Sequence, residues 1–218
     1  MKINYIVLTK EEIKKVNKQT VESIKNILTK EDTYSIVKFT NNDLDDKYFT
    51  INEIKEEYDY TCLIPDGSTL NNNYRILIEE YFDGNKKIYL PLVLITTNGE
   101  TKGVLNSCVY SPSAFEPGLL DFQLASMQID TTLFGALIPT EFLLEKKNFH
   151  EQIKFYQHFY FLNVITAKNN EVRGIPKLLV NLDYDLSYNS YSKEEKMSNY
   201  KLAHIDLEVE TEIETVNG

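Results

Sequence analysis

An alternation of apolar and polar side chains near the carboxyl end is the feature that most constrains the fold. In residues 180–188 every second residue is apolar or aromatic, and Asn, Asp or Ser stands between them. Residues 203–209 repeat this pattern. A period of two gives a strand one buried face and one wet face. The two segments are therefore predicted to form an antiparallel hairpin around the loop YSKEEKMSN.

Further apolar runs upstream of this hairpin are also predicted as strands. They are residues 74–81, 88–97, 119–129, 133–144 and 155–166. Asp83-Gly84-Asn85 is a hairpin signal between the first two. Together these strands predict a mostly antiparallel, barrel-like sheet.

The first part of the chain has a different pattern, typical of β-α-β. Residues 3–8 and 34–39 are predicted strands, and Thr9 with Glu12 forms a Thr-x-x-Glu capping box before the helix. The helix is indicated by apolar residues that share one face: Ile13, Val16, Val21, Ile24, Ile27 and Leu28. Residues 51–58 are predicted as a short helix.

The run PDGSTLNNN, residues 65–73, is dense in turn-forming residues and is predicted to be a domain boundary. The sequence thus predicts an α+β protein. Residues 1–73 form an N-terminal αβ region, a β-α-β addition, and residues 74–218 form the antiparallel β-barrel-like domain.

Composition and charge argue against several classes of partner and indicate a location. The 218 residues carry a net charge of −10, which argues against nucleic-acid and anionic membrane partners. The two cysteines, Cys62 and Cys108, lack the spacing or number of a disulfide framework. The first residues do not form a signal peptide, and no apolar run is long enough to span a bilayer. A cytoplasmic location is expected.

Lysine 177 is the main catalytic candidate. The three histidines, at 150, 158 and 204, stand at no metal-ligand spacing, so no metal is predicted. Gly174 and Pro176 predict a rigid turn directly before Lys177. A lysine amine attacks a carbonyl only when it is neutral, and Arg173 is a neighbouring cation that favours that form. The alternative interpretation is a solvated lysine at the start of a strand.

The segment EVRGIPKLL, residues 171–179, resembles the Glu-x-x-Gly-x-Pro-Lys-Lys-x turn of the acetoacetate decarboxylase family. Glu116-Pro117, ALIPTEF and YQHFYFLN resemble segments that precede this turn in the family, in the same order. The resemblance implies that Lys177 forms a Schiff base with a small oxo acid. Arg173, Glu171 and His158 would bind or position the substrate, with no cofactor, in a homo-oligomer. Leu178 replaces the family's second lysine, so aldol or dehydration chemistry through the same imine is as well supported as decarboxylation.

A second resemblance starts further upstream. Residues 92–119 are similar to the start of the flavin reductase-like FMN-binding split barrels. That resemblance implies bound FMN, with Ser107, Cys108, Ser111 and Ser113 near the flavin and Thr131 and Thr132 following. A third interpretation is a non-enzymatic binding or assembly protein on a degenerate barrel. The Schiff-base enzyme is the leading prediction.

Overall fold

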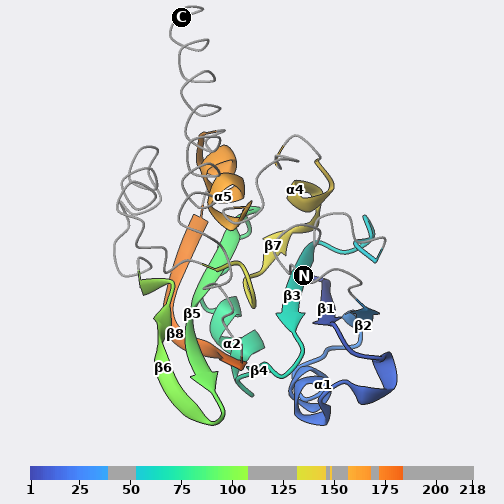
Figure 1. The fold of residues 1–218 in the computed structure, drawn as a ribbon. Coiled ribbons are helices and arrows are strands. Elements are labelled where there is room, and N and C mark those ends of the chain that lie inside the picture. The colour runs from blue at the N-terminus through green and yellow to red at the C-terminus, as the bar shows by residue number, and fades with distance from the viewer. Residues whose placement is uncertain (39–52, 108–131, 146–147, 149–156, 168–171, 184–218) are drawn as a thin grey trace, which may run out of the picture.

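The chain forms two four-stranded sheets in the part that the computed structural model describes, which is residues 1–38, 53–107, 132–145, 148, 157–167 and 172–183 (Figure 1). Each sheet contains both parallel and antiparallel neighbours. The fold of these residues is therefore mixed α/β, and the predicted antiparallel barrel is wrong.

The first sheet has the strand order β2-β1-β3-β7. Its strands are β2 (Thr33–Lys38), β1 (Ile3–Thr9), β3 (Tyr60–Pro65) and β7 (Ile138–Pro139). The first three are parallel, and β7 is antiparallel to β3. Every residue of β1 and β3 is buried, as expected for parallel strands covered on both faces.

The predicted N-terminal β-α-β element is confirmed. Between β1 and β2 the chain forms a 3-10 helix, η1 (Ile13–Lys15), and the helix α1 (Lys18–Lys25). The predicted capping box is absent. Asn17 caps α1 by accepting a hydrogen bond from the Gln19 amide, at 2.9 Å, and the Thr9 hydroxyl donates to Asp66 instead.

The second sheet has the order β4-β8-β5-β6. Its strands are β4 (Thr69–Leu70), β8 (Val172–Asp183), β5 (Ile88–Thr97) and β6 (Glu100–Leu105). The central pair, β5 and β8, is parallel. Strands β5 and β6 form a hairpin around Asn98 and Gly99, which both have positive φ, as this two-residue turn requires.

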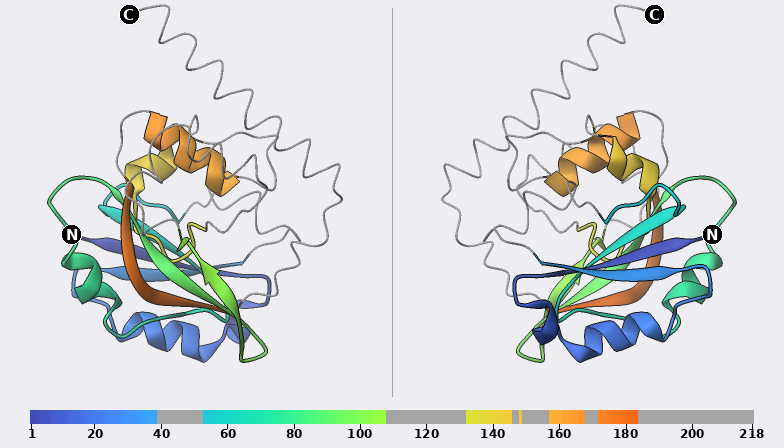
Figure 2. Two further views of the ribbon diagram at one scale, coloured as in Figure 1. Left: turned by 90° about the vertical axis from the view of Figure 1, so that its left-hand side faces the viewer. Right: turned by 90° about the vertical axis from the view of Figure 1, so that its right-hand side faces the viewer.

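Two of the predicted strands are helices. They are α2 (Tyr74–Glu79) and α5 (Gln157–Ala167), and a third helix, α4 (Thr140–Leu144), lies within the predicted strand 133–144. The Asp83-Gly84-Asn85 turn therefore joins a helix to β5, not two strands. Residues 53–58 are not helical. Helices α4 and α5 lie at one end of the molecule and α1 at the other (Figures 1 and 2).

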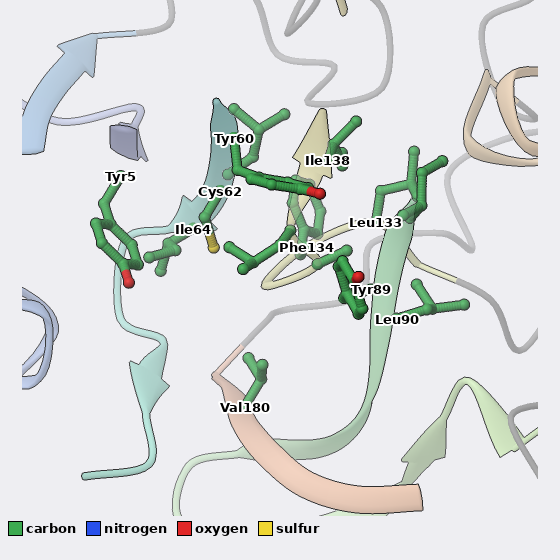
Figure 3. Close-up of a cluster of buried hydrophobic side chains, with 14 of the residues drawn as sticks. Tyr5, Tyr60, Cys62, Ile64, Tyr89, Leu90, Leu133, Phe134, Ile138 and Val180 are labelled. Carbon is green, nitrogen blue, oxygen red and sulfur yellow. The ribbon is translucent and has the colours of Figure 1, made fainter. Parts of the chain in front are cut away.

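The hydrophobic core lies between the two sheets. Tyr5 of β1, Cys62 of β3 and Val180 of β8 contribute to one cluster with Phe134 (Figure 3). The hairpin partner at residues 203–209 and the strand at 119–129 fall outside the described residues. The predicted division of the chain at residue 73 stays a prediction. No helix in the described ranges is long and apolar enough to cross a membrane.

Candidate functional site

The carboxyl ends of β1 and β3 form a junction at which the chain leaves in two directions. After β1 it passes through η1 and α1 to β2, on one side of β1. After β3, on the other side of β1, it passes to β4 in the second sheet. In open α/β sheets ligands bind outside the carboxyl ends of the strands, at the point where the strand order reverses. This junction is therefore the candidate site.

Asp66 is the first residue after β3, and contacts from the end of β1 and from the start of α1 hold it at the junction. Its backbone N–H donates to the Leu8 carbonyl at 2.8 Å. Its carboxylate accepts from the Thr9 hydroxyl, at 2.8 Å, and from the backbone N–H of Asn17, also at 2.8 Å. A carboxylate oxygen can accept more than one hydrogen bond, so each Asp66 oxygen keeps the capacity to accept another from a ligand.

A buried hydroxyl of α1 holds the loop that follows Asp66, and a second one holds the start of the second sheet beyond it. The Gly67 N–H donates to Thr20 Oγ1 at 3.0 Å, and the Leu70 N–H donates to Ser23 Oγ at 3.1 Å. Gly67 has φ +91°, which favours glycine. A Cβ at this position would lie 3.4 Å from the Asp183 carbonyl oxygen, so the end of β8 also borders this loop.

Lysines are frequent on the other segment that borders the junction. Lys10 follows β1, Lys14 and Lys15 belong to η1, and Lys18 begins α1. All four are exposed. Glu11 and Glu12 lie in the same segment, and Glu11 pairs with Lys15 at 4.0 Å. Residues 10–18 therefore carry four lysines against two glutamates, a local excess of positive charge in a chain whose net charge is −10.

The rigid turn predicted at Gly174 and Pro176 is wrong, because both residues lie within the strand β8. Lys177 is exposed and lies within the 12-residue strand β8. It falls in a bulge, because Ile175 pairs with Pro91 and Leu178 pairs with the next residue, Leu92. Arg173 is exposed on the same strand, with its guanidinium carbon 5.9 Å from the centre of the Tyr81 ring.

The other predicted residues are less fully described. His158 lies on α5. The structure describes the backbone at this position but not the His158 side chain. Glu171 lies outside the described residues, as do Cys108, Ser111, Ser113 and Thr131 of the flavin resemblance. Ser107 and Thr132 are described, and Thr132 is buried, with its N–H donating to Asn106 Oδ1 at 2.7 Å. The described residues hold no group of three or more metal-ligating side chains.

No protein-family model and no curated protein matches the chain. Solved structures do match. The chain is similar to S. aureus TarS 1–349 in complex with UDP, with a TM-score of 0.56 and 14% identity over 93% of this chain and 65% of that one. TarS 1–349 itself has a TM-score of 0.53 and 12% identity, over 84% and 60% of the two chains. A longer TarS chain has a TM-score of 0.50 and 13% identity, over 85% and 37%. The chain thus spans less than two thirds of the TarS chains that it matches.

This likeness overturns the two predicted families. The fold is that of TarS chains, not of acetoacetate decarboxylases or FMN-binding split barrels. The predicted lyase reaction on an oxo acid through a Schiff base is wrong, as is the alternative of FMN binding, and the similar structure holds UDP rather than an oxo acid. The degenerate barrel assumed by the non-enzymatic alternative is wrong as well, while a binding or assembly role stays a prediction. The site roles predicted for that reaction stay predictions; they concern Lys177, Arg173, Glu171 and His158. The predicted homo-oligomer also stays a prediction.

Sequence reasoning missed Asp66 as a functional residue. Its Pro-Asp-Gly-Ser context was interpreted only as a boundary between domains. The available signal was the position of a carboxylate directly after a fully buried strand, because such positions lie at the ligand-binding edge of a parallel sheet.

Proposed function

We propose that this chain binds a UDP-linked sugar at the carboxyl ends of β1 and β3 and takes part in glycosyl transfer. The observation that carries the proposal is the position of Asp66, held by Thr9 and Asn17 at the edge where ligands of such sheets bind. The TarS likeness supports the nucleotide class, because one of the matching TarS structures is a complex with UDP.

The chemistry of Asp66 suits a uracil base. Uracil carries one imide N–H between two carbonyl groups, and a carboxylate is an acceptor for that N–H. Hydrogen bonds to a charged acceptor are stronger than neutral ones. Because Thr9 and Asn17 already direct both carboxylate oxygens, the group is oriented before the ligand arrives.

The lysines between β1 and α1 suit the diphosphate. Lys10, Lys14, Lys15 and Lys18 can reduce the electrostatic cost of bringing a dianionic group to an acidic protein. In the proposed reaction an acceptor hydroxyl forms a bond to the anomeric carbon of the sugar. The bond from that carbon to the β-phosphate oxygen breaks, the hydroxyl loses its proton, and UDP leaves.

The test is a calorimetric titration of UDP into the wild-type chain and two variants. Asp66→Asn replaces one carboxylate oxygen, an acceptor, with an amide NH2, a donor, and removes the negative charge that would attract the uracil N–H. We therefore expect UDP affinity to fall by about tenfold or more. Asp59→Asn is the matched control. Asp59 precedes β3, at the opposite end of the same strand, and its carboxylate accepts from the Lys2 N–H at 2.7 Å. We expect this variant to bind UDP as the wild type does.

Two results would overturn the proposal. One is a folded wild-type chain that does not bind UDP at millimolar concentration. The other is equal weakening by both substitutions, which would place the nucleotide elsewhere. Release of UDP from UDP-sugars, followed over time, tests the transfer reaction separately.

A further inference from the structure

We infer that Thr20 of α1 is a positioning residue for the nucleotide, acting through the backbone of the Asp66 loop. This inference rests on the proposed function. The Thr20 side chain is fully buried, so it does not touch a ligand at the junction. Its hydroxyl oxygen accepts the Gly67 N–H at 3.0 Å.

The peptide group between Asp66 and Gly67 is the link between Thr20 and the carboxylate. A peptide group is planar, so the direction of the Gly67 N–H also sets the direction of the Asp66 carbonyl. Gly67 has φ +91° and lacks a side chain, so its own backbone preferences restrain this peptide weakly. The Thr20 hydroxyl therefore supplies a restraint that glycine does not.

Helix α1 holds Asp66 at two points. The backbone N–H of Asn17, the residue that caps α1, donates to the carboxylate, and Thr20 accepts from the next peptide along the loop. The carboxylate and the peptide that follows it are thus both hydrogen-bonded to the first turn of one helix. Loss of the Thr20 acceptor leaves the carboxylate end fixed but frees the peptide plane beside it.

Ser23 provides a comparison within the same helix. Its hydroxyl accepts the Leu70 N–H at 3.1 Å and donates to the Thr20 carbonyl at 2.8 Å. Both hydroxyls therefore accept one backbone N–H from a buried position. The difference is that Leu70 lies in β4, where it also pairs with Val180, whereas Gly67 is adjacent to Asp66.

The experiment compares Thr20→Val, Thr20→Ser and Ser23→Ala by thermal unfolding and by UDP titration. Valine matches the shape of threonine without the acceptor, so Thr20→Val should weaken UDP binding by about five- to tenfold. Thr20→Ser keeps the hydroxyl and should restore wild-type affinity. Ser23→Ala should lower the unfolding temperature to a similar degree as Thr20→Val, with UDP affinity unchanged.

Equal loss of UDP affinity in Thr20→Val and Ser23→Ala would overturn the inference, because a general structural role predicts that result. Unchanged affinity in Thr20→Val would also overturn it and would leave the proposed function intact. Failure of the wild-type chain to bind UDP would instead overturn the proposed function.

A measurement on the unaltered protein keeps the inference testable if Thr20→Val does not fold. Hydrogen exchange of the Gly67 amide should slow when UDP is added, because a bound nucleotide stabilises the loop that the Gly67–Thr20 bond restrains. Exchange of the Leu70 amide should change less. Equal slowing at both positions, or none at Gly67 while UDP binds, would contradict the role of Thr20.

Discussion

Gly135 connects the two sheets at a single residue. Its N–H donates to the Leu63 carbonyl of β3 at 2.8 Å, and its carbonyl accepts from the Tyr74 hydroxyl at 2.7 Å. Its α-carbon faces Val180 of β8, so closely that an added methyl group would overlap that side chain. Its φ of +73° is also one that favours glycine. Any side chain here would push the first sheet away from the second.

Gly135→Ala should therefore destabilise the protein by about 2–4 kcal/mol, from overpacking and backbone strain together. Gly84→Ala is the control, because Gly84 has φ +86° but open space where a Cβ would lie. It carries the backbone cost alone, about 1 kcal/mol. Urea unfolding measures both free energies. Equal values would show that the contact with Val180 relaxes without cost.

Cys62 should be unreactive in the folded protein. Burial raises the pKa of its thiol to about 12, and its Sγ lies 3.5 Å from the Tyr74 hydroxyl. In a Cys108→Ser background, Ellman's reagent at pH 8 should label Cys62 only after urea is added. Because the folded pKa is raised, the contribution of this thiol to stability is present below about pH 8.5. It is lost as the pH rises from there toward about 12. Rapid labelling without urea would contradict the closed core.

At the scale of elements, one ion pair joins β1, α2 and the turn before β2. The Asp32 carboxylate is fully buried and accepts from the Ile3 N–H at 2.8 Å and the Thr29 N–H at 2.9 Å. Arg75 of α2 donates to both Asp32 oxygens at 3.2 Å and to the Met1 carbonyl at 2.8 Å. The pair thus sets where α2 lies against the start of the first sheet.

Arg75→Met should destabilise the protein by about 3–5 kcal/mol, because it leaves the buried Asp32 carboxylate without its cation. Adding Asp32→Asn should recover part of that loss. Lys86→Met removes an exposed pair with Glu141 and should cost less than about 1 kcal/mol. Chemical unfolding of these three variants and the wild type measures the differences in stability. An Arg75→Met protein as stable as the Lys86→Met protein would show that α2 is held by apolar packing alone.

Sequence patterns predicted helices and strands correctly where the apolar spacing matched only one of the two. The β-α-β element was recognisable because an apolar strand, a helical face and a second strand follow in order. Helix α5 was misassigned because its apolar residues surround the helix, and such a run matches a strand equally well. The turn Asn98-Gly99 carries the strongest short hairpin signal, and it joins β5 to β6. The hairpin expected at Asp83-Gly84-Asn85 is wrong, because the segment before that turn is the helix α2.

At the scale of the whole molecule, strand direction was the property that sequence could not supply. The alternation in β8 identifies a strand with one buried face, and residues 180–183 confirm it. That pattern is local, however, and it does not reveal that the neighbour β5 runs parallel. The candidate site was missed for a similar reason. The carboxylate after an apolar run was a general signal, and Asp66 becomes a specific candidate once Thr9 and Asn17 are known to hold it, because the fold brings them to it from elsewhere in the chain.

The position of β8 also bears on how the protein is made. Strand β5 lies between β6 and β8, and residues 98–171 must leave the ribosome before β8 follows. Until then one edge of β5, rich in apolar residues, lacks its partner strand. An unpaired apolar edge is a site for aggregation. Nascent chains that stop before residue 172 are therefore the forms of this protein that depend most on chaperones.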